Sequence, residues 1–360
     1  MSSSLALSLR AQELSRFRTR GITIAIISGL AYGLYTAFIS LALETGYWGE
    51  WQTEHSGFSQ FAAVYLLGIL ASGLTYIISG IWALIVGGVR GKLGDTFRVL
   101  RTAPGRALML CAVIGGPIGT VAYILALQSA GAIVIPIAAL CPAFGAIISR
   151  IWFKQPLTKH MTLGIIVCLV ATCLIGLSAG FYAGPDMVIG ILLALLAAVA
   201  WAFEGAIGGM GTTVVDYEIA ITIRQWTAGL TTLLLVLPLV GVIGREPLVA
   251  AEFFRYTLTS PSILLWVALA GFFCLFAFSL WYRGNSMCGT ALGMAANGTF
   301  AFWGPFFCWL LLGVILRMPG WNIAPIAWFG ALLMCFGILL IAVDPRTFFA
   351  ERRNRALGVA

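Results

Sequence analysis

The residues from 197 to 227 read AAVAWAFEGAIGGMGTTVVDYEIAITIRQWT, and this stretch determines how the chain must fold. It begins in an apolar segment, 187–211, where Trp201 and Glu204 are three residues apart and lie on one helical face. A charged side chain in the middle of a bilayer costs at least about 2.5–3.5 kcal/mol, so it usually faces a partner or a cavity and marks a function. The next apolar segment, 219–243, carries Arg224. In a helical hairpin both charges lie about two turns from the shared turn, which predicts a polar, aromatic-lined site inside a membrane protein.

The composition excludes an ordinary soluble domain. Hydrophobic residues make up 61% of the 360 residues and charged residues 9%, against about 25% charged in an average soluble protein. The eight cysteines lie in apolar segments without metal-ligand spacing, so we expect neither a disulfide framework nor a metal, and no cofactor. The net charge of +8 comes from basic residues in short loops beside apolar segments, which predicts orientation in a membrane rather than nucleic-acid binding.

Ten apolar runs reach the roughly 20 residues that a membrane-spanning helix needs. They are 21–45, 58–88, 107–128, 131–153, 160–182, 187–211, 219–243, 262–282, 288–312 and 324–343. Most of the 21 lysines and arginines fall in alternate loops and in both tails, whereas the opposite loops hold only Arg245, Arg255 and Arg317. This bias predicts an all-α polytopic protein with ten transmembrane helices and with the N- and C-termini in the cytoplasm.

The two halves of the chain repeat. Residues 29–38, GLAYGLYTAF, are similar to residues 198–207, AVAWAFEGAI, which places Tyr32 opposite Trp201 and Tyr35 opposite Glu204. An odd number of helices per repeat makes the second copy enter the membrane from the other side, an arrangement typical of transporters. The predicted divisions are a tail at 1–20, five-helix repeats at 21–185 and 186–344, and a basic tail at 345–360. Glycine and proline clusters at 115–119, 136–142 and 297–305 interrupt helices, either to line a cavity or to allow close packing.

These features resemble the drug/metabolite transporter superfamily with its EamA-type repeats, over about residues 21–343. Four strings carry a narrower resemblance to the Lic-type bacterial choline permeases: GGPIG at 115–119, AVAWAFE at 198–204, IRQ at 223–225 and NGTFAFW at 297–303. The resemblance implies import of choline or a related quaternary amine, driven by protons or the membrane potential, across the cytoplasmic membrane of a bacterium. It implies a lipid-embedded monomer or homodimer that binds a small molecule.

A quaternary ammonium group cannot donate conventional N–H hydrogen bonds, so aromatic faces and a counter-charge must recognise it. The candidate faces are Tyr32, Tyr35, Tyr123, Trp201, Trp226, Phe300 and Trp303. Glu204 is the candidate counter-charge and Asn297 the candidate partner for a substrate hydroxyl. Arg224, beside Gln225, is the candidate charge partner that keeps Glu204 ionised.

The chain departs from those permeases at two places. They have Trp where this chain has Tyr32, and they carry a His-Asp pair in helix 2 where this chain has Leu74 and Thr75. The second difference bears on the cargo and leaves the expected fold unchanged.

Three alternatives follow from the residues. Glu204 and Arg224 can form a structural ion pair that fixes the hairpin. The chain can be an exporter of amino acids or other metabolites, with this pair binding a zwitterion. It can also be a membrane enzyme or a sensor. The sequence contains no Ser-His-Asp arrangement and no Gly-rich phosphate loop, so we expect no catalytic residues.

Overall fold

The computed structural model describes residues 2–53, 57–152, 158–178, 184–212 and 214–342, and within them every regular element is a helix. Seven helices in these ranges are long and apolar enough to cross a membrane. They are Glu13–Glu44, Ala62–Val89, Ala103–Ala138, Pro185–Gly209, Tyr217–Ile243, Pro261–Cys288 and Leu292–Ile315, and two shorter apolar helices span Lys159–Ile175 and Pro325–Ile341. The protein is therefore an all-helical, multi-pass membrane protein.

The first half of the chain contains α1 (Ser2–Glu44), α2 (Gly46–Trp51), η1 (Ala62–Leu66), α3 (Leu67–Val89), α4 (Leu93–Leu100), α5 (Ala103–Val113), η2 (Ile114–Thr120), α6 (Val121–Ala130), η3 (Gly131–Ile133), α7 (Val134–Ala138), α8 (Cys141–Trp152) and α9 (Lys159–Ser178). The second half contains α10 (Pro185–Gly211), α11 (Tyr217–Thr231), η4 (Thr232–Val236), α12 (Leu237–Ile243), α13 (Pro247–Thr259), α14 (Pro261–Cys288), α15 (Thr290–Asn297), α16 (Phe300–Cys308), η5 (Trp309–Ile315) and α17 (Pro325–Ala342).

Helix boundaries differ in places from the predicted segments. The expected tail at 1–20 is helical from Ser2 and continues into the first span as part of α1. Gly131, with φ +63° and ψ −153°, separates α6 from the next turn in a conformation that only glycine adopts readily. The predicted fourth segment is divided between the short helices α7 and α8. The predicted tail at 345–360 lies outside the described residues.

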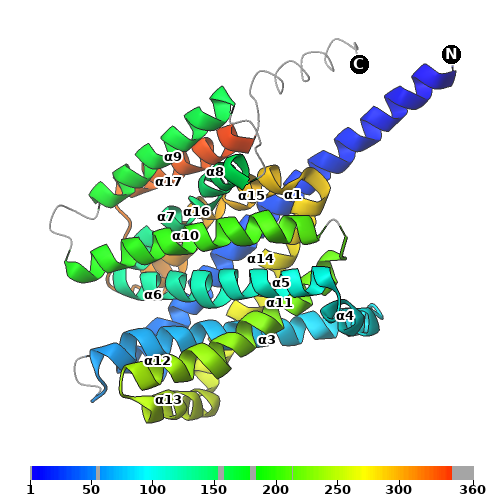
Figure 1. Ribbon diagram of the computed structural model, residues 1–360. Coiled ribbons are helices and arrows are strands. Elements are labelled where there is room, and N and C mark those ends of the chain that lie inside the picture. Colours follow the sequence, from blue (N-terminus) through cyan, green and yellow to red (C-terminus); the bar gives the residue numbers. More distant parts are fainter. Residues whose placement is uncertain (1, 54–56, 153–157, 179–183, 213, 343–360) are drawn as a thin grey trace.

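The helices pack in a regular set of pairs (Figure 1). Helix α1 of the first half lies along α14 and α16 of the second half, and α10 of the second half lies along α6 and α8 of the first. Helices α3 and α11 pack against each other, and so do α9 and α17. This arrangement puts α10 and α11, which carry Glu204 and Arg224, among α3, α5, η2 and α14.

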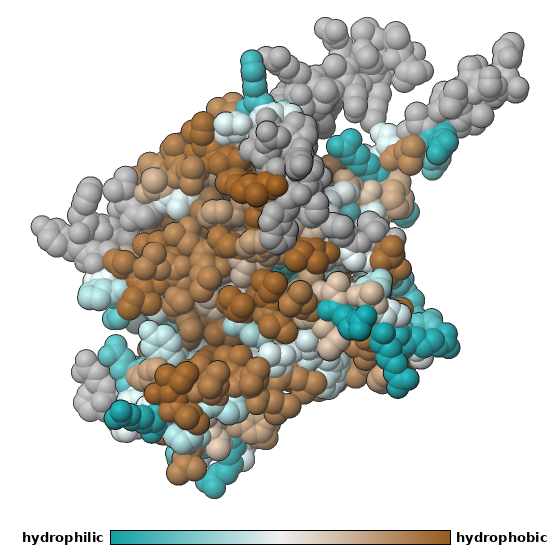
Figure 2. Space-filling model, viewed as in Figure 1, coloured by the Kyte–Doolittle hydropathy of each residue, from teal (hydrophilic) through white to brown (hydrophobic). Residues whose placement is uncertain are grey.

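Apolar side chains face outward along the long helices, as expected for contact with lipid. Leu234 is 72% exposed on η4, and Leu192 on α10 is 60% exposed. Figure 2 shows hydrophobic residues across the middle of one face and hydrophilic residues toward the end where α4 lies. The apolar exterior follows from the solvent, because lipid tails accept leucine as readily as a protein core does.

Glycines allow α1 to approach its neighbours closely. A Cβ atom added to Gly33 would lie 2.7 Å from the backbone carbon of Trp303 on α16, and one on Gly29 would lie 2.6 Å from the carbonyl oxygen of Asn297. The two glycines are four residues apart, so they form one small-residue face of the kind that packs helices in membranes.

We expect Gly33→Ala to destabilise the protein by about 1–3 kcal/mol, because the added methyl group meets backbone that cannot move aside. The matched control is Gly94→Ala on α4, where an added Cβ would meet only the end of Arg98 at 3.9 Å. That variant is expected to be unchanged or more stable by up to about 1 kcal/mol. Thermal unfolding of the purified protein in detergent measures both, and equal melting temperatures would contradict the packing argument.

Candidate functional site

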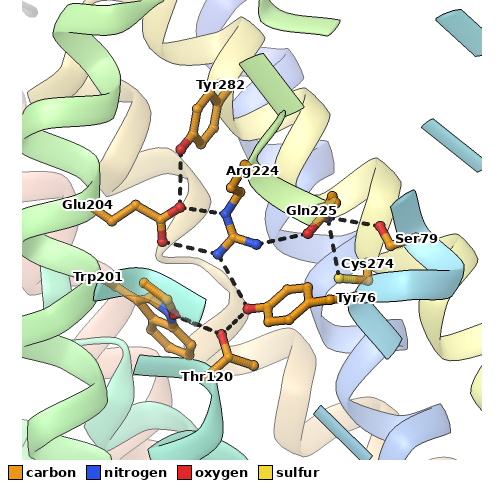
Figure 3. Close-up of polar contacts among 10 residues, drawn as sticks. Tyr76, Ser79, Thr120, Trp201, Glu204, Arg224, Gln225, Cys274 and Tyr282 are labelled. Carbon is orange, nitrogen blue, oxygen red and sulfur yellow. Dashed lines mark hydrogen bonds and ion pairs between the residues drawn. The ribbon is translucent and has the colours of Figure 1, made fainter. Parts of the chain in front are cut away.

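A buried ion pair joins α10 to α11 (Figure 3). Arg224 Nε donates to Glu204 Oε1 at 2.5 Å and Nη2 donates to Oε2 at 3.1 Å, and both side chains are 0% exposed. The hairpin between them is set locally, because the side chain of Asp216 caps α11 by accepting a hydrogen bond from the Glu218 backbone N–H at 2.9 Å. The predicted pairing of the two charges is therefore present in the structure.

Further polar groups form hydrogen bonds with the remaining donors and acceptors of the ion pair. The Tyr282 hydroxyl donates to Glu204 Oε1 at 3.1 Å. Arg224 also donates to Gln225 Oε1 at 2.9 Å and to the Tyr76 hydroxyl at 3.3 Å. Its guanidinium carbon lies 3.6 Å from the centre of the Phe278 ring, a cation–π contact. A buried pair offsets its desolvation only when the remaining donors and acceptors are also bonded, and these partners meet that requirement.

Gln225 extends this network to α3 and α14. Its side-chain amide donates to Ser79 Oγ at 2.8 Å and reaches Cys274 Sγ at 3.7 Å. The same side chain accepts from Arg224 through its oxygen, so both ends of the amide are used. Gln225 thereby fixes the orientation of the guanidinium.

The GGPIG string forms η2, a π-helical turn packed against α10 and α11. A Cβ on Gly115 would lie 1.7 Å from Glu204 Oε2, so only glycine leaves room for the carboxylate. The Gly115 carbonyl accepts hydrogen bonds from Trp201 Nε1 and Thr120 Oγ1, each at 3.1 Å. The Tyr76 hydroxyl donates in turn to Thr120 Oγ1. These side-chain hydrogen bonds connect η2 to α10 and to α3.

An aromatic cluster lies beside the ion pair, with Tyr32 of α1 at its centre. We define it as Tyr32, Tyr35, Tyr123, Trp201, Phe278 and Phe300. The centre of the Tyr32 ring is 4.6 Å from that of Phe300, 5.2 Å from Tyr35, 5.7 Å from Trp201, 5.9 Å from Phe278 and 6.0 Å from Tyr123. The rings come from α1, α6, α10, α14 and α16, so the cluster draws on both halves of the chain. Phe278 belongs to the cluster and also contacts Arg224, which links the two parts of the site.

The structure brings together eight of the eleven candidate residues. Trp226, Asn297 and Trp303 lie apart from them. Trp226 donates to the Gly80 carbonyl at 3.1 Å, and Asn297 donates to Ser28 Oγ at 2.7 Å. The Trp303 ring packs on Phe302, Phe306 and Phe307.

Six residues of the site were missed: Tyr76, Ser79, Thr120, Cys274, Phe278 and Tyr282. A signal existed for two of them, because Phe278 and Tyr282 are four residues apart and lie on one face of α14. Within the described residues, no three His, Cys, Asp or Glu side chains gather as metal ligands.

Comparisons with known proteins bear on the fold alone. No known protein family and no curated protein matches the chain. A solved structure described only as a crystal structure of a protein superposes with a TM-score of 0.55, at 21% identity, over 91% of this chain and 98% of its own. At that identity the match is evidence of a shared fold and says nothing about the function.

We expect Arg224→Met and Glu204→Gln, made separately, each to destabilise the protein by about 3–5 kcal/mol, because each leaves a buried group without its partner. The double variant is expected to recover most of that loss. The control is Arg16→Met, which removes an exposed pair with Glu13 and is expected to cost less than about 1 kcal/mol. Unfolding in detergent gives these values, and a double variant as unstable as the sum of the single variants would show that the two groups do not interact.

Proposed function

We propose that this protein is a secondary active transporter that imports a small organic cation, choline or a related quaternary amine, by alternating access. The observation that carries the proposal is the aromatic cluster centred on Tyr32 beside a fully buried charged network. Ring faces attract a quaternary ammonium group by about 0.5–2 kcal/mol each, and several rings converge on one position here. A packing role alone does not account for a Glu-Arg pair in the membrane interior, because apolar residues of similar volume are often as stable or more so.

The proposed architecture is ten membrane crossings in two inverted five-helix repeats, with both termini in the cytoplasm. The packing pairs support it. Exchanging α1 for α10, α5–α6 for α14, and α7–α8 for α15–α16 turns one set of contacts into the other. The same exchange swaps α3 with α11 and α9 with α17, so each of these two contacts is mapped onto itself. An internal twofold relation of this kind lets two halves rock about a site between them.

Contacts between the two halves differ at the two ends of the bundle, which supports alternating access. At one end, Lys92 pairs with Asp216 at 2.9 Å and with Glu218 at 2.8 Å, and Arg90 also pairs with Glu218. These ion pairs tie the α3–α4 connection to the start of α11.

At the other end, α2 packs on α13 through aromatic rings. Trp48 Nε1 donates to Thr257 Oγ1 at 2.8 Å, and the ring of Trp51 stacks on Phe253 at 4.3 Å. Separate ionic and aromatic contacts can open one at a time, as an alternating mechanism needs.

One observation favours the second candidate function, export of amino acids or other small metabolites. Glu204 is neutralised by Arg224, so the network has no net charge. It contains one negative and one positive group, which match the two charges of a zwitterion. Transport assays with both classes of cargo separate these candidates.

We expect proteoliposomes containing the purified protein to exchange radiolabelled choline, and Tyr32→Leu to weaken its apparent affinity by between about 2- and 30-fold through loss of one ring face. The control is Trp309→Leu, which removes a larger aromatic ring that packs on Phe306 and Trp328 away from the cluster. If the proteoliposomes exchange amino acids but not quaternary amines, the result favours the second candidate function, export of amino acids or other small metabolites. Binding of choline without flux would contradict a transporter and favour a sensor or an enzyme.

A further inference from the structure

Two hydroxyl groups in the aromatic cluster have no hydrogen-bond partner among the described protein atoms. They belong to Tyr32 and Tyr35, which are 4% and 0% exposed. Phenolic O–H groups are almost always bonded when buried, because removal from water without a partner is costly. The two residues are three apart on α1, so their side chains lie on the same face of that helix.

The other buried tyrosines of the site differ. Tyr123 shares a hydrogen bond with Thr36 at 2.9 Å, Tyr282 donates to Glu204, and Tyr76 bonds both Arg224 and Thr120. Among the tyrosines of the site, only Tyr32 and Tyr35 therefore lack a partner among the described protein atoms. Phenylalanine would pack as well at both positions without that cost, which points to a ligand as the partner.

The charge of the site limits which ligand fits. Among the described buried residues of the site, Glu204 and Arg224 are the charged side chains, and they form an ion pair with each other. A bare cation would find ring faces but no free carboxylate. A ligand with its own negative group brings no net charge into this neutral site, and hydrogen-bond donors must offset the desolvation of that negative group.

We infer that the substrate is a betaine-class zwitterion, whose quaternary ammonium group lies among the rings and whose carboxylate accepts hydrogen bonds from the Tyr32 and Tyr35 hydroxyls. This inference rests on the proposed function and narrows the quaternary amine to one that carries its own carboxylate. Two phenolic donors match the two oxygens of one carboxylate, and hydrogen bonds to a charged acceptor are about twice as strong as neutral ones.

Binding requires that the rings separate. The Tyr32 ring contacts five others at 4.6–6.0 Å between centres, so the ammonium group takes the place of some of these contacts. The partners of Tyr32 lie on α6, α10, α14 and α16 as well as on α1 itself. A shift of α1 relative to α10, α14 and α16, which belong to the other half, makes room, and such a shift is part of a rocking movement between the halves.

The test is isothermal titration of the full-length protein in detergent with three probes: glycine betaine, choline and tetramethylammonium, which has no oxygen. We expect glycine betaine to bind at least about tenfold more tightly than tetramethylammonium. Tyr32→Phe together with Tyr35→Phe should reduce that ratio to about threefold or less, while tetramethylammonium affinity changes by less than about twofold because the ring faces remain. Tyr65→Phe, outside the cluster, is the control for both probes.

A second measurement separates ligand recognition from folding. Without ligand, the double phenylalanine variant should melt no lower than the wild type, because its hydroxyls have no protein partner to lose. Tyr123→Phe should melt lower, because it leaves Thr36 without its partner.

The outcomes distinguish failure of the inference about the substrate from failure of the proposed function. If the double variant loses affinity for glycine betaine and for tetramethylammonium to the same extent, the inference is overturned, and the proposal of a quaternary-amine transporter still stands. Choline binding as tightly as glycine betaine would also overturn it, because a hydroxyl would then serve as well as a carboxylate. If the wild type binds none of the three probes, the proposed function fails and the inference fails with it.

Discussion

The structure depends on keeping one carboxylate and one guanidinium together inside the membrane. Separating Glu204 from Arg224 would leave an uncompensated charge in a medium with no water to solvate it. The pair therefore constrains the hairpin between α10 and α11, which must place both groups at one depth. It also requires glycine at position 115, where no side chain fits beside the carboxylate. Tyr282 and Gln225 bring α14 and α3 into the same network, so one electrostatic requirement holds together helices from both halves.

The ion pair could be predicted from sequence because an apolar segment offers very few solutions for a buried carboxylate. Glu204 needed a cation at similar depth, and Arg224 was the candidate within one hairpin. The GGPIG string could be recognised as an interruption, although its role in admitting the carboxylate appears only once η2 is seen against α10. Seven long apolar helices agree with a multi-pass protein, and the division at Gly131 falls where the predicted segments 107–128 and 131–153 meet. The helical N-terminal segment and the division of the fourth segment into α7 and α8 depend on local backbone conformation, and hydrophobicity alone does not reveal them.

The aromatic cluster was predictable only in part, for a geometric reason. Helical periodicity tells which residues share a face, but it does not tell which neighbour that face meets. Tyr32, Trp201 and Phe300 were found through repeats and motifs, whereas the only signal for Phe278 is its four-residue spacing from Tyr282, which does not tell which neighbour that face meets. Trp303 was a candidate through the NGTFAFW string, yet its ring packs on Phe306 and Phe307.

Phe278 is the physical link between the two parts of the site. The Arg224 guanidinium lies over this ring, 3.6 Å from its centre, and the Tyr32 ring meets it nearly edge to face at 5.9 Å and 64°. A ligand that moves Tyr32 removes one of the contacts holding Phe278, and any rotation of Phe278 changes the cation–π contact of Arg224. Binding of a ligand in the aromatic cluster therefore changes the contacts of the ion pair. Because the same arginine bonds groups on α3, α10 and α11, a local change at the rings acts on helices of both halves.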